Sequence, residues 1–124
     1  MATVPDFWGE IAQTEVRTPV AILREQAAAL GPKTKHLVEA QVVTRPHQSE
    51  ISHSFDLVVP ALEDYTYQLF RIRHDAVSLY PVWVNDFPEL SLKNEDAFVA
   101  WLRVRLSSPD TKRIIGNLLA QVNS

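Results

Sequence analysis

A change of hydrophobic period in the middle of the chain most constrains its fold. Between residues 37 and 84, β-branched and aromatic residues alternate with polar ones, whereas apolar residues on both sides recur at helical spacing. Turn-forming residues divide the alternating stretch into short runs. The sequence therefore predicts a β-sheet flanked by helices. The four predicted strands are residues 37–44, 51–59, 65–74 and 77–84.

Capping residues predict the helices on either side of this sheet. Thr18, Asn94 and Ser108 each precede an apolar helical repeat, and proline follows two of them at the first helical position. A glycine–proline pair ends the first repeat, because glycine adopts the left-handed cap and proline does not continue a helix. Asp6 predicts one or two further helical turns near the amino terminus. The predicted helices are residues 6–14, 19–31, 95–106 and 109–122.

Short connections between the predicted strands favour an antiparallel meander, since parallel neighbours need crossovers of about a dozen residues. Three apolar helix stripes then cover one face of the sheet. We therefore expect a single α+β domain over residues 1–124, with the order α-α-β-β-β-β-α-α. It is a two-layer sandwich with a four-stranded antiparallel sheet, one or two N-terminal helices and two C-terminal helices on one face.

The turns decide which side chains share a sheet face. A two-residue turn at Asp75-Ala76, Phe55 opposite Phe70 and Val42 opposite His53 bring all four strands into phase. Shifting strands two and three by one residue would bury two unpaired arginine side chains, at a cost of several kcal/mol. The chosen register places these residues on the core face: Val38, Ala40, Val42, Ile51, His53, Phe55, Leu57, Val59, Phe70, Ile72, Val77, Leu79 and Trp83. The opposite face carries Glu39, Asp56, Val58, Tyr65, Tyr67, Leu69, Arg71, Arg73, Tyr80 and Val82.

Composition narrows the classes of function. A net charge of −3 in 124 residues gives no bulk attraction to nucleic acid or anionic membranes. The chain has no cysteine, which excludes thiol nucleophiles, disulfides and cysteine-ligated metals. No apolar run approaches the ~20 residues that span a bilayer, and no signal-peptide pattern opens the chain. We therefore expect a cytoplasmic protein without nucleic-acid or membrane partners.

The polar sheet face is the first candidate site. Tyrosine and arginine are enriched at protein interfaces, and three apolar residues on the same face make it more apolar than solubility needs. In this register Arg71 lies opposite Tyr80 and diagonal to Asp56, which allows a cation–π contact and an ion pair. The binding residues are Glu39, Asp56, Tyr67, Arg71, Arg73 and Tyr80. The alternative is that this face has no binding role and is a solvent-exposed sheet surface with ordinary cross-strand pairs.

The second candidate site is a pocket between sheet and helices near His53, Tyr65 and Trp83. Imidazole is the side chain most easily tuned near neutral pH, so such a pocket suits a small-molecule-binding protein or an enzyme. The alternative for His53 is a neutral core histidine satisfied by hydrogen bonds. The four histidines do not converge at metal-ligand spacing, and no catalytic motif occurs.

The sequence thus predicts a small non-enzymatic binding protein, with no cofactor, metal or catalytic residues. Its partner is another protein or a second copy of itself, bound through the polar sheet face. One version is an acidic protein that blocks a basic toxin or nuclease site by charge complementarity. Six aromatic residues near the two ends are predicted to pack in the core: Phe7, Trp8, Trp83, Phe87, Phe98 and Trp101.

Overall fold

Three helices and five strands make up the structure, a computed structural model that describes residues 6–85 and 89–124. Thr18, Asn94 and Ser108 accept hydrogen bonds from first-turn backbone amides at 3.1, 2.8 and 3.2 Å. These caps satisfy amides that have no partner within the helix. The elements are α1 (Pro19–Lys33), β1 (Glu39–His47), β2 (Glu50–Val59), the 3₁₀ turn η1 (Pro60–Leu62), β3 (Tyr65–Asp75), β4 (Val82–Val84), β5 (Leu90–Leu92), α2 (Glu95–Leu106) and α3 (Pro109–Val122).

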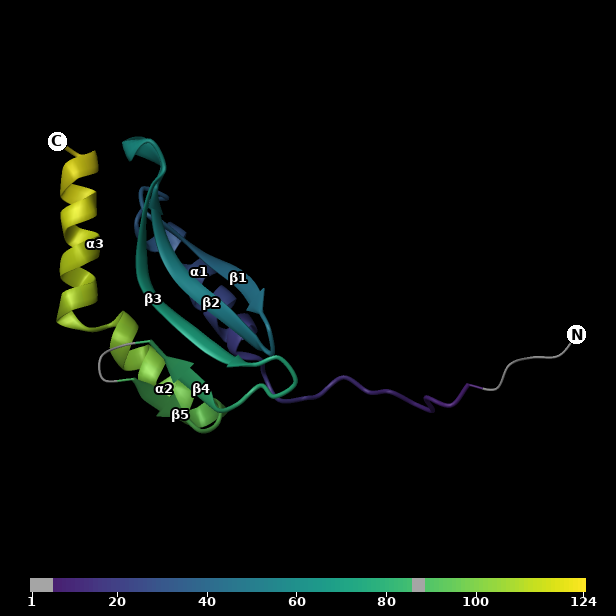
Figure 1. Cartoon of the computed structure of the whole chain (residues 1–124). Coiled ribbons are helices and arrows are strands. Elements are labelled where there is room, and N and C mark those ends of the chain that lie inside the picture. Colours follow the sequence, from purple (N-terminus) through teal and green to yellow (C-terminus); the bar gives the residue numbers. More distant parts are fainter. Residues whose placement is uncertain (1–5, 86–88) are drawn as a thin grey trace, which may run out of the picture.

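The predicted α+β two-layer fold is confirmed. The strands form one antiparallel sheet in the order β1-β2-β3-β4-β5, so the meander has one strand more than the sequence predicts. The bounds of α2 and α3 match the prediction, whereas α1 ends two residues later, at Lys33. Helix α1 packs against β1, and α2 lies beside β5 (Figure 1). Within the described residues, no helix combines the length and the apolar character needed to cross a membrane.

The predicted first helix is wrong. Residues 6–17, which we call the arm, run as an exposed segment away from the body, without helix or strand and with bends at Trp8 and Val16 (Figure 1). The Asp6 carboxylate accepts a hydrogen bond from the Trp8 amide at 2.9 Å, and Gly9 has φ +63°. A helix this short is marginal in water without packing, and Phe7 and Trp8 pack on nothing, with 92% and 80% of their surface exposed. The prediction that both are core residues is therefore wrong. Of the other aromatic residues predicted for the core, Phe87 lies outside the residues that the structure describes.

The core lies between the sheet and the helices. Phe55 and Leu57 of β2 and Phe70 and Ile72 of β3 are buried on the helix-covered face, where Phe98 of α2 is fully buried. Phe55 stacks on Phe70 with ring centroids 5.2 Å apart, as the predicted pairing requires. The inner face of β2 is thus the one expected from its alternation.

The β1–β2 hairpin differs from the predicted register by an even number of residues. Its turn is Gln48-Ser49, so Thr44 rather than Val42 lies opposite His53, and Val42 lies opposite Phe55. Because side chains alternate with a period of two, a shift of two residues changes the partners and keeps the face. The core face of β1 is therefore as predicted.

A β-bulge in β3 reverses the predicted face of two tyrosines. Phe55 pairs with Phe70 but Asp56 pairs with Gln68, so Leu69 is an extra residue on β3. Beyond the bulge Leu57 pairs with Tyr67 and Val59 with Tyr65, and directly opposed residues share a face. Tyr65, Tyr67 and Leu69 are therefore on the helix side of the sheet, not on the polar side.

The last part of the meander is also out of phase with the prediction. Residues 76–81 form a loop instead of a strand, and the pairs are Ile72 with Val84 and Arg73 with Trp83. The predicted hairpin paired Ile72 with Leu79, which is an odd shift and exchanges the faces. Val82 and Val84 are consequently buried, and Trp83 is on the outer face.

Candidate functional site

The outer sheet face retains both arginines of the predicted site. Arg73 donates to a Glu50 carboxylate oxygen at 2.9 Å, pairs with Glu89 and lies over the Trp83 ring, 5.4 Å from its centroid. With the Asn85 amide turned so that its oxygen faces Arg71, that oxygen accepts from Arg71 Nε and Nη2 at 3.1 and 3.0 Å. The predicted cation–π contact of Arg71 with Tyr80 is replaced by Arg73 on Trp83, because β4 is shifted.

The two carboxylates of the predicted site do not join these arginines. Asp56 is buried on β2 between Gln41 and Gln68, and its Oδ1 has no hydrogen-bond partner among the described residues. Glu39 lies at the start of β1 and accepts from His36 Nδ1 at 2.8 Å. The described residues form no ion pair between Asp56 and either arginine.

Tyr80 lies at the base of the arm. Its hydroxyl donates to the Arg17 carbonyl oxygen at 2.9 Å, and its ring is 6.5 Å from that of Phe98. Burial, with a smaller contribution from the nearby Glu95 carboxylate, raises the pKa of Tyr80 to about 12. Of the six predicted binding residues, the structure thus places Arg71 and Arg73 side by side on β3 and puts Tyr67 and Tyr80 elsewhere.

The three residues of the predicted pocket are also separated. His53 is buried in the middle of β2, Tyr65 lies near Leu118 of α3, and Trp83 is on the outer face. His53 Nε2 lies 3.0 Å from His74 Nε2, and His53 Nδ1 lies 2.9 Å from the Thr44 hydroxyl. Burial, then the neighbouring His74 and Arg24, lower the pKa of His53 to about 4.

Proton positions in this histidine pair follow from its neighbours. His74 Nδ1 faces the carbonyl oxygens of Asp75 and Ser78 at 2.8 and 3.2 Å, and carbonyls only accept, so Nδ1 carries the proton. The pKa of His53 is low, so its ring carries one proton near pH 7, and its two nitrogens divide the donor and acceptor roles toward His74 Nε2 and the Thr44 hydroxyl. His53 is thus a buried histidine satisfied by hydrogen bonds, the alternative given for it above.

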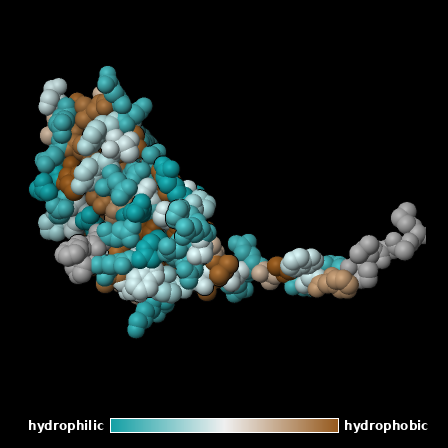
Figure 2. All heavy atoms as spheres, in the orientation of Figure 1, coloured by the Kyte–Doolittle hydropathy of each residue, from teal (hydrophilic) through white to brown (hydrophobic). Residues whose placement is uncertain are grey.

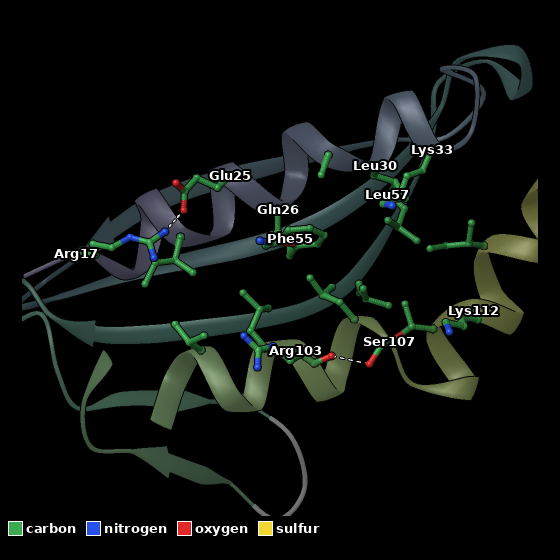
Figure 3. Close-up of a pocket in the computed structure, with 18 residues that line it drawn as sticks. Arg17, Glu25, Gln26, Leu30, Lys33, Phe55, Leu57, Arg103, Ser107 and Lys112 are labelled. Atoms are coloured by element: carbon green, nitrogen blue, oxygen red, sulfur yellow. Dashed lines mark hydrogen bonds and ion pairs between the residues drawn. The ribbon is translucent and has the colours of Figure 1, made fainter. Parts of the chain in front are cut away.

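A groove lies between α1 and the α2–α3 pair. It has a volume of about 860 Å³, and its floor is Phe55, Leu57 and the bulged Leu69. Helix α1 forms one wall with Ile22 and Leu30 (Figure 3). The opposite wall consists of Val99, Leu102 and Leu106 of α2 with Ile115 of α3.

Hydrogen bonds at the α2–α3 junction hold the second wall. Thr111 is fully buried and its hydroxyl donates to the Arg105 carbonyl oxygen at 2.8 Å. The Arg105 guanidinium donates to the carbonyl oxygen of Leu69 at 3.0 Å, which ties α2 to the bulge. The bulge therefore supplies the groove with both an apolar floor residue and the acceptor that fixes one wall.

The groove has a basic rim although the chain is acidic overall. Four basic side chains and one acidic side chain line it, and the acidic one, Glu25, is paired with Arg17 (Figure 3). Lys33, Arg103 and Lys112 have no carboxylate partner among residues 6–85 and 89–124. The rim therefore favours a ligand that carries negative charge.

Sequence reasoning assigned the apolar groove residues to the core and did not locate the groove. Its apolar floor and walls read as ordinary helix stripes and strand residues, and the separation of α1 from α2 and α3 has no local signal. His36, His47, His53 and His74 stay apart except for the buried pair, and no group of three or more metal-ligating residues occurs in the described parts of the chain. Comparisons with family models, curated proteins and solved structures found no match to this chain.

Proposed function

We propose that this protein binds an apolar, negatively charged segment of a protein in the groove between α1 and the α2–α3 pair. The proposal depends on one observation: an apolar floor is combined with three basic rim residues that have no carboxylate partner in the described part of the chain, although the net charge is −3. Apolar anchors supply affinity in such a site, whereas rim charges select the partner and speed association. The proposal keeps the predicted class, a binding protein, and moves the site from the outer sheet face to the groove.

The groove supports binding better than catalysis. Its polar lining consists of basic side chains, the paired Glu25, Gln26, Ser107 and Thr111. The histidine with the perturbed pKa does not line it, so no general base stands beside a nucleophile there. Groove chemistry therefore consists of apolar burial and cation–carboxylate attraction.

Peptide selection tests this proposal directly. A displayed library of random peptides is panned on the full chain carrying Phe7→Ser and Trp8→Ser, which removes the two exposed aromatic side chains of the arm. The affinities of the selected peptides are then measured by fluorescence anisotropy. We expect apolar, acidic sequences whose affinity falls about tenfold with Lys112→Glu or with Ala29→Glu, because a rim charge is reversed or a carboxylate enters the groove. Ala28→Glu is the matched control, since Ala28 is an exposed neighbour that does not line the groove.

Two results would count against peptide binding. Selected peptides that bind Ala29→Glu as well as the parent would place the site elsewhere on the molecule. A small apolar molecule that copurifies with the chain, detected by native mass spectrometry and lost in Ala29→Glu, would favour the small-molecule alternative, because the groove volume lies in the ~300–1,000 Å³ range of such sites.

A further inference from the structure

The arm is apolar and acidic, which is the composition that an apolar groove with a basic rim favours. Phe7, Trp8, Ile11 and Val16 expose 92%, 80%, 75% and 50% of their surface. Large aromatic side chains are rarely left in water without a function, since each can bury ~150–250 Å². Figure 2 shows apolar residues along the arm as well as on the body beside α3.

The charge of the arm is opposite to that of the groove. Asp6, Glu10 and Glu15 are its acidic residues, and Arg17 at its base is its one basic residue. The groove rim carries Lys33, Arg103 and Lys112 without carboxylate partners among the described residues. An acidic segment with two adjacent aromatics is thus attached to the same chain as an apolar groove with a basic rim.

Two hydrogen bonds fix the backbone of Arg17, from which the arm runs away from the body (Figure 1). The Arg17 amide donates to a Glu95 carboxylate oxygen at 3.0 Å, and the Arg17 carbonyl oxygen accepts from the Tyr80 hydroxyl at 2.9 Å. Residues 10–17 contain neither glycine nor proline. Folding the arm back into its own groove would need a reversal in a stretch that lacks turn residues. A groove on a second copy needs no such reversal.

The arm is long enough to reach a second copy. Helix α1 has 15 residues and is about 22 Å long, whereas 12 extended residues span at most about 40 Å. Residues 7–11 would occupy about 17 Å of the groove, and the remaining arm residues would bridge the two bodies. Phe7 and Trp8 of both arms, with the groove walls that they cover, approach the ~1,600 Å² of a standard interface.

We infer that the arm of one copy binds in the groove of a second copy, giving a two-fold dimer by reciprocal arm exchange. This inference rests on the proposed function and names the segment that the groove takes. Each copy contributes one arm and one groove, so the two contacts are equivalent and the assembly closes. The acidic residues of the arm then face the basic rim of the partner.

Sedimentation velocity over a range of concentrations tests arm exchange. We expect the full wild-type chain to dimerise, and the variants Phe7→Ser/Trp8→Ser and Ala29→Glu each to be monomeric where wild type is dimeric. Ala28→Glu and Val77→Ser are the controls, because both residues are exposed and neither belongs to the arm or the groove. Circular dichroism shows whether each variant remains folded.

A mixture of Ala29→Glu with Phe7→Ser/Trp8→Ser tests arm exchange most directly. The Ala29→Glu chain keeps an intact arm and the Phe7→Ser/Trp8→Ser chain keeps an intact groove, so together they form one productive contact. We expect a 1:1 heterodimer in the mixture, weaker than the wild-type dimer. A dimer that persists in Phe7→Ser/Trp8→Ser, or a mixture that stays monomeric, would overturn arm exchange.

A synthetic peptide of residues 6–17 separates this inference from the proposed function. A wild-type chain that is monomeric at every concentration, but binds the peptide in an Ala29-dependent manner, overturns the dimer and leaves peptide binding in the groove intact. Failure of every selected peptide to depend on Ala29 removes the proposed function, whatever the oligomeric state.

Discussion

His53 and His74 face each other across β2 and β3 with their Nε2 atoms 3.0 Å apart and their rings stacked at 5.1 Å. Both side chains are buried, with 2% and 4% of their surface exposed. Only one proton fits between the two nitrogens, so the contact requires that one ring donates and the other accepts. Burial and the neighbouring His74 hold the pKa of His53 low, and this has a consequence for stability.

Stability should fall with acid between pH 6.5 and about 4. The pKa of His53 is lowered to about 4 in the fold, so the unfolded chain binds the extra proton in this window and is favoured as the pH falls. A pKa lowered from 6.5 to about 4 corresponds to about 3 kcal/mol at most. Urea unfolding measured at several pH values checks this.

His53→Gln should reduce the pH dependence of the free energy of unfolding between pH 6.5 and about 4. His47→Gln, at an exposed position in the same hairpin, is the control and should leave that pH dependence unchanged. Equal slopes for wild type and His53→Gln would contradict the role given to His53.

Tyr80→Phe should loosen the base of the arm. The substitution removes the hydroxyl that donates to the Arg17 carbonyl oxygen and leaves the ring in place against Phe98. Losing this hydrogen bond should lower the free energy of local opening at Arg17 by about 1 kcal/mol. The open form is then about fivefold more populated, so tryptic cleavage after Arg17 should be about fivefold faster. Tyr67→Phe is the control, because Tyr67 is an exposed residue of β3 away from the arm. Equal cleavage rates for the two variants would show that the hydroxyl does not hold the arm.

Thr111→Val should weaken the α2–α3 junction. Valine has nearly the same shape but lacks the hydroxyl that donates to the Arg105 carbonyl oxygen at 2.8 Å, in a site with 1% exposure. The Arg105 carbonyl keeps the Ser108 amide as a donor at 3.3 Å, but it loses the shorter hydrogen bond, and the Ser108 hydroxyl loses its acceptor. We expect a loss of about 1–2 kcal/mol in the free energy of unfolding, which thermal or urea unfolding measures. Thr66→Val, on an exposed part of β3, should cost less than half as much. A neutral Thr111→Val would mean that α3 is held by apolar contacts alone.

Arg73→Met should destabilise the outer sheet face by about 1–2 kcal/mol. The change keeps most of the apolar stem but removes the ion pairs with Glu50 and Glu89 and the guanidinium over Trp83. Part of this difference should disappear at high salt, because salt screens the partly exposed ion pairs more strongly than the close contact of the guanidinium with the ring. Urea unfolding at low and high salt measures this difference in the free energy of unfolding. Arg45→Met, at an exposed position of β1, is the control. A salt-independent difference would assign the effect to Trp83 alone.

Local signals determined much of the fold. Capping by Thr18, Asn94 and Ser108 fixes where the helices begin, because a side-chain oxygen next to unpartnered amides acts within one turn. Alternation identified the inner face of β2, and Phe55 opposite Phe70 was predicted correctly. These features depend on residues close in sequence or on the period of a single strand.

The candidate site could not be predicted in the same way. One extra residue in β3 at Leu69 moved Tyr65 and Tyr67 to the other face, and the loop over residues 76–81 exchanged Val82 with Trp83. A bulge adds one residue to a strand, and a longer loop can shift the pairing by an odd number of residues. Either change inverts the faces beyond it, while the alternation in the sequence stays the same.

The sequence by itself determined the α+β class, the starts of α1, α2 and α3, and the separation of the arginines from the core. Only the tertiary structure decided that α1 lies apart from α2 and α3, that Leu69 forms the floor between them, and that Lys33, Arg103 and Lys112 share one rim. These residues come from different elements, and their distance is set by how helices pack on a bulged sheet. The same packing leaves Phe7 and Trp8 outside the core, where they can meet a partner.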